Sequence, residues 1–250
     1  YWYKGRLGKL TAGPIWDFDR AQGSTDGRDF DYSVWSPPAG SGTDFFTYPW
    51  YKEMLADPNF MQAWIDRLDQ LRQGTLATAN IKARIDEFAA ILNPGNAANT
   101  PAKRTVQRWT VSTPRAAGSN NALTNGSFDG TYQGEVNWLK YWWERRLLFM
   151  DSQVTRPVTT SPAAGTVAVG TNVTLTSASM AVPGLKIYYT TDGSDPRAPG
   201  GAPAATAQVY SAPIKLNVNT KLTMRALSPM PVAPITSGWS APSTAMYTVQ

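Results

Sequence analysis

The sequence predicts an α+β protein in which a mostly helical part is followed by an immunoglobulin-like β-sandwich. Apolar residues recur at helical spacing in three segments before residue 152, and nine of the ten Trp residues lie in this part. After residue 152, short alternating runs rich in Thr and Val are separated by Gly and Pro turns. We therefore expect a helical domain over residues 1–152, a Thr/Pro-rich linker over 153–163 and a sandwich over 164–250.

The first strong helix is predicted to begin at Asp57, because an Asp cap is followed by Pro58 at the first helical position. Gly74 ends this helix. A second helix is predicted over about 79–92, and the turn-forming residues 93–95 end it. We expect the apolar stripes of both helices to be core: Phe60, Met61, Trp64, Ile65, Leu68 and Leu71 in the first, and Ile81, Ile85, Phe88, Ala89 and Leu92 in the second.

A third helix is predicted over residues 134–153, after a polar stretch in which only residues 104–109 favour a short helix. Its Arg145 and Arg146 either form a solvated face, or one of them reaches a carboxylate in the body of the domain. The expected apolar stripe comprises Val136, Leu139, Trp143, Leu147 and Met150, widened by Trp142 and Phe149.

The last hundred residues predict short strands of two-residue periodicity. The pairs Val173 and Leu175, Ile187 and Tyr189, and Leu222 and Met224 are expected to alternate with outward-facing residues. Several such strands in about 95 residues are typical of a sandwich. The expected strands are residues 167–177, 185–193, 207–216, 220–228 and 243–250.

The stretch GPIWDFDR, residues 13–20, is the most informative chemical feature. The run before it predicts a short hairpin, whose second strand we expect to end at residues 15–18. Residues two apart on a strand share a face, so Asp17 and Asp19 are expected to project together. Two such carboxylates repel each other unless a cation, an Arg or solvent lies between them. From spacing alone, a metal site and a solvated ion-pair cluster with the adjacent Arg20 both stay open.

Composition restricts the chemistry of any site. The chain has neither His nor Cys, which excludes imidazole bases, thiol nucleophiles and disulfides. A metal would therefore have oxygen ligands, which favours Mg²⁺, Mn²⁺ or Ca²⁺. The net charge of +5 is mild for 250 residues, so we expect no nucleic-acid partner. We also expect no membrane span and see no signal peptide.

The order of these elements resembles the C-terminal half of the CotH kinase family, the spore coat protein H-like atypical protein kinases. The resemblance rests on GKLTAGPIWDFDRAQG, on the helices DPNFMQAWIDRLDQL and TANIKARIDEFAAIL, on a basic segment ending in RW, and on EVNWLKYWWERRLLFMD. It covers about residues 1–152. It implies the C-terminal lobe of a protein-kinase-like fold and phosphoryl transfer from ATP to protein Ser or Thr, dependent on Mg²⁺ or Mn²⁺.

Residue roles follow from this resemblance. Asp17 would be the metal-binding acid, and Asp19 a second ligand or a support for the first. Trp16 and Phe18 would pack beneath the site, with Arg20 as a supporting residue. The catalytic Asp and the nucleotide-covering lobe are expected upstream of residue 1, so these 250 residues alone are expected to be inactive.

Two further groups of charged residues are candidates for a structural or a binding role. The acids Asp26, Asp29 and Asp31 are expected to make turns. The basic residues Lys103, Arg104, Arg108 and Arg115, with Trp109 among them, form either a solvated loop or a docking site for an acidic or phosphorylated protein substrate, in which Arg104 and Arg108 are the candidates.

The last part is similar to the C-terminal module of chitobiases and β-hexosaminidases, through IYYTTDGSDPR, VYSAPIKL, TKLTMRAL and WSAPSTAMYTV. The resemblance implies a secreted or cell-surface bacterial protein. It also opens an alternative function, a non-catalytic carbohydrate-associated binding or spacer protein in which exposed Tyr188, Trp239 or Tyr247 stack on sugars. The turn at residues 192–196 is expected to form a turn first and a Ca²⁺ site only second.

Overall fold

The structure is a computed structural model, and it describes residues 2–14, 22, 30–35, 49–109 and 131–250. The chain divides into two compact units, which are described separately below. The first comprises Tyr1–Asp44 and Ala77–Phe149, and the second comprises Phe45–Leu76 and Met150–Gln250.

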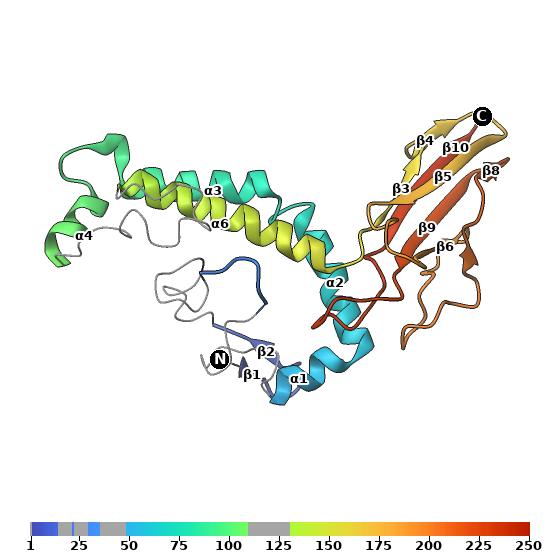
Figure 1. Cartoon of the computed structure of the whole chain (residues 1–250), viewed down its shortest axis with the longest axis horizontal. Coiled ribbons are helices and arrows are strands. Elements are labelled where there is room, and N and C mark those ends of the chain that lie inside the picture. Colours follow the sequence, from blue (N-terminus) through green and yellow to red (C-terminus); the bar gives the residue numbers. More distant parts are fainter. Residues whose placement is uncertain (1, 15–21, 23–29, 36–48, 110–130) are drawn as a thin grey trace. The chain divides into compact units, whose positions relative to one another are not determined.

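The first unit is mostly helical (Figure 1). It contains β1 (Trp2–Tyr3), β2 (Thr11–Ala12), α3 (Thr78–Leu92), the short 3₁₀ helix η1 (Pro94–Asn96), α4 (Pro101–Trp109) and most of α6 (Tyr132–Gln153). The two strands pair antiparallel, which confirms the predicted hairpin. The predicted continuation of its second strand, residues 15–18, lies outside the described residues.

Helices α3 and α6 lie side by side (Figure 1). Polar side-chain contacts join them. Lys82 Nζ lies 3.0 Å from Glu144 Oε2, and Lys140 pairs with Asp86. Near the other end, the Tyr132 hydroxyl donates to the carbonyl of Ala89 at 3.2 Å. Partly exposed ion pairs of this kind contribute about 1 kcal/mol or less each to stability. Their contribution to holding α3 on α6 is therefore small.

The expectation that the α3 stripe is core is wrong. Ile81, Ile85 and Ala89 are half-buried, whereas Phe88 is 50% and Leu92 48% exposed. Helix α3 buries no residue completely, because its described contacts are with α6 and a two-helix contact covers only part of an apolar face. In α6, by contrast, Val136, Trp138, Trp142 and Leu147 are buried.

The second unit begins with α1 (Pro49–Ala56) and α2 (Pro58–Arg72). Asp57 caps α2 as predicted: its Oδ1 accepts hydrogen bonds from the backbone N–H groups of Asn59 and Phe60 at 2.7 and 2.9 Å. The predicted core stripe of this helix is confirmed at Met61, Ile65 and Leu68, which are buried. It is wrong at Phe60, which is 39% exposed, and Trp64 and Leu71 are half-buried.

We expect Asp57→Ala to lower the free energy of unfolding of the second unit by about 1 kcal/mol, because two N–H groups lose their acceptor. Chemical denaturation followed by circular dichroism measures this change. Asp57→Ser should restore most of the loss, because a Ser hydroxyl accepts the same bonds. A cost equal in both variants would contradict the capping role.

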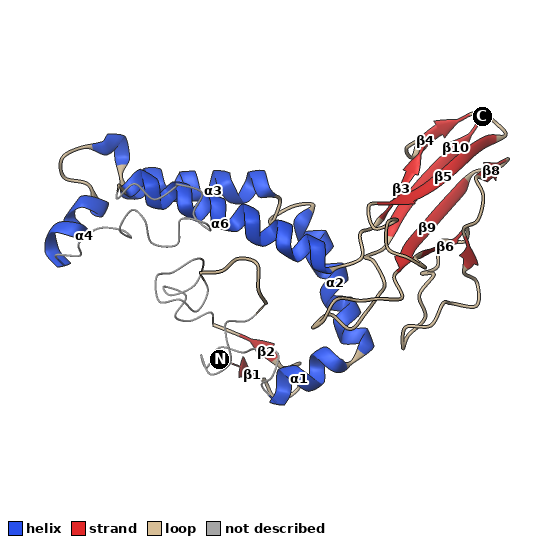
Figure 2. Cartoon of the chain, viewed as in Figure 1, coloured by secondary structure: helices blue, strands red, loops and turns tan. Residues whose placement is uncertain are grey.

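The rest of the second unit is a sandwich of two sheets (Figure 2). One sheet has the order β4-β10-β9-β6-β7 and the other the order β3-β5-β8. All pairs are antiparallel except β4 with β10. The strands are β3 (Val158–Ser161), β4 (Gly165–Val167), β5 (Thr171–Ser177), β6 (Lys186–Thr190), β7 (Gln208–Val209), β8 (Ile214–Leu216), β9 (Thr220–Leu227) and β10 (Ser243–Val249).

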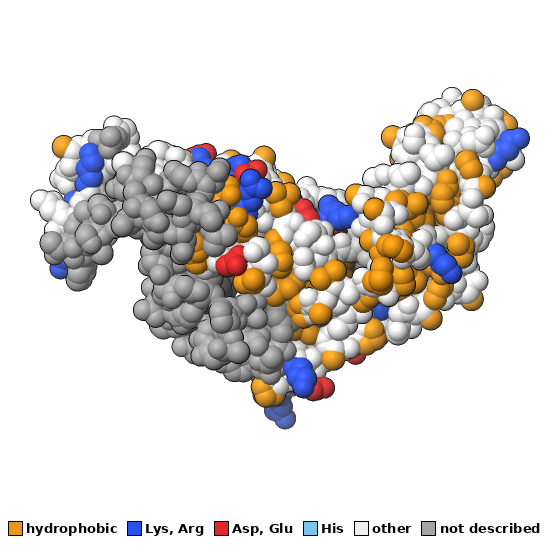
Figure 3. Space-filling model, viewed as in Figure 1, with side chains coloured by type: hydrophobic (Ala, Val, Ile, Leu, Met, Phe, Trp, Pro, Cys, Tyr) orange, Lys and Arg blue, Asp and Glu red, His pale blue; other side chains and the backbone are white. Residues whose placement is uncertain are grey.

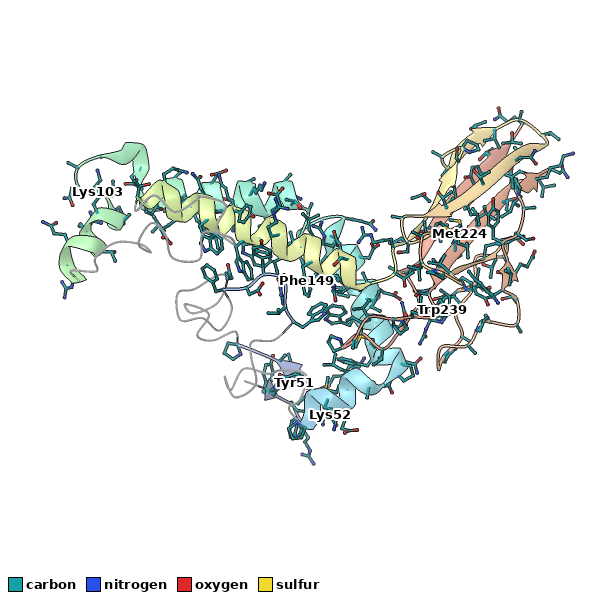
Figure 4. The ribbon with its side chains drawn as sticks, in the orientation of Figure 1. Tyr51, Lys52, Lys103, Phe149, Met224 and Trp239 are labelled. Carbon is teal, nitrogen blue, oxygen red and sulfur yellow. The ribbon has the colours of Figure 1, made fainter. Side chains whose placement is uncertain are left out.

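Residues from both sheets form one apolar core, which confirms the predicted α+β class with a sandwich. Val173 and Leu222 are fully buried there, as is Met224 (Figure 4). Strand β3 lies within the segment expected as a linker. Val158 at its start is 3% exposed and belongs to the core, so residues 158–161 are part of the sandwich and not of a linker.

In strand β9, residues 222–226 are all buried instead of alternating. Leu222, Met224 and Ala226 point into the sandwich core. Thr223 and Arg225 therefore lie on the other face of the sheet, and this face is covered too.

Within the described residues, no helix is both long enough and apolar enough to cross a membrane.

Candidate functional site

The acidic stretch predicted as a metal site, with Trp16, Asp17, Phe18, Asp19 and Arg20, lies outside the described residues. Asp26 and Asp29 lie outside them as well. Among the described residues, no group of three or more acidic side chains is placed to hold a metal ion. The structure does show how the chain on either side of the acidic stretch is held.

On the N-terminal side, the hairpin leads into Gly13, whose φ of 135° is accessible to Gly but strained for other residues. On the C-terminal side, Gln22 has a φ of 68°, the only positive φ of a non-Gly residue in the described part of the chain. Its side-chain Oε1 accepts a hydrogen bond from the Trp143 indole N–H at 3.0 Å. Helix α6 therefore holds the chain three residues after Asp19.

A second anchor on α6 holds Phe30. The Trp142 indole N–H donates to the Phe30 carbonyl at 3.0 Å, and the Phe30 ring stacks on Trp138 with centroids 5.1 Å apart. All three residues are buried. A buried carbonyl without a donor costs about 1–3 kcal/mol, so the Trp142 hydrogen bond fixes the backbone here as well as the ring.

Arg146 provides the third anchor. Its guanidinium donates to the carbonyl of Tyr32 at 3.1 Å and to that of Val34, and it lies over the rings of Trp35 and Phe149. A guanidinium suits this position because its planar fork donates to several carbonyls while its face stacks on aromatic rings. For Arg146 the two predicted alternatives were a solvated face or a carboxylate partner. In the described part of the chain it binds backbone carbonyl groups instead.

Tyr32 and Asp31 sit in the same segment. The Tyr32 ring meets Tyr141 edge-on at 6.0 Å, and burial together with a hydrogen bond to Tyr141 raises the pKa of the Tyr32 phenol. Arg145 lies over the Tyr141 ring at 5.1 Å. Asp31 Oδ1 accepts from the N–H and hydroxyl of Ser33 at 2.8 and 2.5 Å, which confirms the predicted turn role.

Helix α6 thus fixes the chain after the acidic stretch at Gln22, at Phe30 and at residues 32–34. Sequence reasoning placed Trp142 and Trp143 on the apolar stripe but missed Trp138 and the polar role of both indoles. The signal was present in the spacing, because Trp138 and Trp142 are four apart and a buried indole N–H needs an acceptor. The acceptors themselves have no sequence signature.

The basic candidates lie on and around α4. Lys103 Nζ donates to the Ala97 carbonyl at 2.8 Å, and Arg104 Nη1 donates to the Asn99 carbonyl at 3.1 Å. Arg104 and Arg108 line an open depression of about 580 Å³ together with Pro101, Thr105 and Gln107. Figure 3 shows Lys and Arg side chains over this part of the surface. Arg115 and the Trp109 side chain lie outside the described residues.

The sugar-stacking alternative is contradicted by burial. Tyr188, Trp239 and Tyr247 are 9%, 2% and 0% exposed. Trp239 packs on Tyr188 with centroids 5.2 Å apart (Figure 4) and donates its indole N–H to the Gly201 carbonyl at 2.7 Å. None of the three presents a ring face to solvent, because Tyr247 lies in the sandwich core and Tyr188 and Trp239 pack on each other.

The turn at residues 192–196 behaves as predicted. Asp192 Oδ1 accepts from the N–H and hydroxyl of Ser194 at 2.9 and 2.6 Å, and these bonds lower the pKa of its carboxyl. Asp195 is occupied by Arg225, which donates to both of its oxygens at 2.7 Å. The acids of this turn are therefore used in local structure.

Comparison with known families finds two matches. A family described as CotH kinase protein matches residues 1–150, and one described as chitobiase/beta-hexosaminidase C-terminal domain matches residues 162–230. Neither the curated proteins nor the solved structures compared with the chain gave a match. Both resemblances seen in the sequence are confirmed, in the expected order.

Proposed function

Because the chain belongs to the CotH kinase protein family, we propose that it takes part in ATP-dependent phosphoryl transfer to Ser or Thr hydroxyls of a protein. Asp17 and Asp19 are the proposed ligands of Mg²⁺ or Mn²⁺. Phosphoryl transfer depends on positioning and charge neutralisation more than on covalent chemistry, so a protein without His and Cys is equipped for it. The proposal assigns the metal ligands and names no catalytic base.

The chemistry of the donor set fits such an ion. Mg²⁺ is usually held by one or two carboxylates together with the phosphates of the nucleotide, and it accepts oxygen ligands. When bound, the ion would neutralise charge on the transferred phosphoryl group. Asp17 would bind it directly, and Asp19 would bind it or hold Asp17 in place.

The observation that supports the proposal most is the anchoring of the chain after Asp19 on α6. A metal site needs ligands held in place by their surroundings. The bond from Trp143 to Gln22 and the bond from Trp142 to the Phe30 carbonyl hold two points of the following segment against one helix. We propose that these contacts, made by residues other than the metal ligands, help to keep Asp17 and Asp19 in place.

We expect Mg²⁺ plus ATP to raise the melting temperature of this chain, and Asp17→Asn to abolish the rise. Binding to the folded state at a hundred times the dissociation constant adds about 2.7 kcal/mol to the free energy of unfolding. Differential scanning fluorimetry with ATP alone, metal alone and both together measures the effect.

The matched control is Asp86→Asn, which removes an exposed carboxylate paired with Lys140 and should leave the rise unchanged. A rise that persists in Asp17→Asn would contradict the proposed metal site.

For the basic surface of α4, we propose docking of an acidic or phosphorylated protein substrate by Arg104 and Arg108. Two guanidinium groups on one open depression suit phosphate and carboxylate groups. We also propose a secreted or cell-surface bacterial location, as the resemblance to the chitobiase-type module implies.

A second candidate function is a non-catalytic spacer protein. Within this alternative, the burial of Tyr188, Trp239 and Tyr247 favours a spacer over a protein that stacks sugars on these rings. The melting experiment separates the two candidates, because a spacer has no reason to bind Mg²⁺ and ATP together at Asp17.

A further inference from the structure

Helix α2 presents a polar face at a regular spacing. Asn59, Gln62 and Asp66 lie at positions i, i+3 and i+7, so their side chains share one side of the helix. Gln62 is 3% exposed, which is unusual for a Gln side chain. Its amide N–H also donates to Asp66 Oδ1 at 2.7 Å, which fixes both side chains.

Arg225 of the central strand β9 meets this face. Its guanidinium donates to both oxygens of Asp66, at 2.7 and 2.9 Å, and to both oxygens of Asp195, at 2.7 Å each. It also donates to the Ser240 carbonyl at 2.7 Å. Its side chain is only 3% exposed, so its charge is neutralised by one carboxylate from the helix and one from the DGSDP turn.

The other two residues of the helix face have their own partners in the sandwich. Gln62 accepts a hydrogen bond from the Ser237 hydroxyl at 2.6 Å and donates to the Ser240 carbonyl at 3.2 Å. Asn59 Oδ1 accepts from the Gly200 N–H at 2.8 Å and from the Arg197 guanidinium at 3.3 Å.

The contact also has an apolar part. Ile65 and Leu68 of α2 line a cavity of about 10 Å³ with Val154, Pro157 and Ala241. Ile65 is 1% exposed and Ala241 2% exposed. The polar contacts with α2 explain why Arg225 is buried although it lies on the outer face of its sheet.

The two partners belong to different family matches. Helix α2 falls within residues 1–150, the CotH kinase match, whereas Arg225 and Asp195 fall within residues 162–230, the chitobiase-type match. Yet the structure places both in one compact unit.

We propose that the chitobiase-type sandwich acts as an intramolecular helix-binding module for the CotH kinase part. Its binding face consists of Arg197, Arg225, Ser237 and the Ser240 carbonyl, and the ligand is helix α2, recognised through Asn59, Gln62 and Asp66. A substitution that destabilises α2 should then also destabilise strand β9, and the reverse. The proposal does not depend on phosphoryl transfer.

Hydrogen–deuterium exchange of the whole chain, with Asp66→Asn as the main variant, tests this coupling. The substitution leaves the buried Arg225 with one carboxylate in place of two. We expect the amides of β9 and of α2 to exchange faster by about tenfold or more, because breaking a buried ion pair destabilises the structure that shares it. Arg225→Gln, on the other side of the contact, should accelerate exchange in α2.

Asp86→Asn is the matched control, because it removes a carboxylate of an ion pair in the first unit; exchange in β9 should not change. If Asp66→Asn does not fold, Gln62→Ala provides a milder test, since it leaves the Arg225–Asp66 pair intact and removes only the hydrogen bonds of an uncharged side chain. It should accelerate exchange in β9 in the same direction. Acceleration in α2 with unchanged exchange in β9, in either variant, would overturn the proposal.

Discussion

Arg225→Met is expected to lower the free energy of unfolding of the second unit by roughly 2–4 kcal/mol, because it leaves two carboxylates and the Ser240 carbonyl without their shared donor. Removing one partner of a fully buried ion pair would cost more stability. Here the side chains of Asp66 and Asp195 are 31% and 44% exposed, so water can solvate part of the charge left behind. Urea denaturation followed by circular dichroism measures the loss.

The same change should alter the acid sensitivity of the second unit. Partial burial opposes ionisation of Asp195, but hydrogen bonds from Arg225 and from the Arg197 N–H outweigh it and lower the pKa of its carboxyl. A carboxyl with a lowered pKa in the folded state stabilises that state above its unfolded pKa. This contribution is lost as the pH falls through the folded pKa. We expect the wild-type chain to lose stability below about pH 4, and Arg225→Met to lose less over the same range.

Arg84→Met is the control for this prediction. Arg84 also pairs with a carboxylate, that of Glu87, but its side chain is 62% exposed. Removing it should change stability by about 0.5 kcal/mol or less. Equal losses in the two variants would mean that the burial of Arg225 does not matter.

Local features were predicted well from the sequence, because they depend on residues close together in the chain. The start of α2 follows from the Asp57–Pro58 pair, and the inward residues Val173, Leu175 and Leu222 follow from two-residue periodicity. The turn role of Asp31 follows from its own short side chain. In each case the pattern that predicts the feature lies within a few residues of it.

The long-range contacts were not predictable in this way. Arg225 binds Asp66, 159 residues away, and nothing in either neighbourhood specifies the other. The α3 stripe shows the opposite error, since periodicity indicates that a helix has an apolar face but not how much of that face a neighbour covers. The pairing of Trp143 with Gln22 was missed because an indole N–H can donate to many kinds of acceptor. The predicted metal ligands Asp17 and Asp19 stay predictions.

Trp138→Ala is expected to destabilise the first unit by about 3–5 kcal/mol, the range for removing a large buried aromatic side chain. Trp138 is 3% exposed, stacks on Phe30 and contacts Tyr141 at 6.0 Å between centroids. Its loss removes the surface on which Phe30 rests, although Trp142 can still donate to the Phe30 carbonyl. Hydrogen exchange of the α6 amides under native conditions measures this loss in the first unit.

Trp50→Ala supplies the comparison, because Trp50 is 70% exposed and its removal should cost about 0.5 kcal/mol or less. Trp138→Phe keeps an aromatic ring and should recover part of the stability. Trp138→Ala should also show a smaller melting shift with Mg²⁺ and ATP than Trp138→Phe. The reason is that the segment after the proposed ligand Asp19 is held less firmly on α6. An unchanged shift alongside a large loss of stability would restrict Trp138 to packing and leave Trp143 and its bond to Gln22 as the anchor closest to the acids.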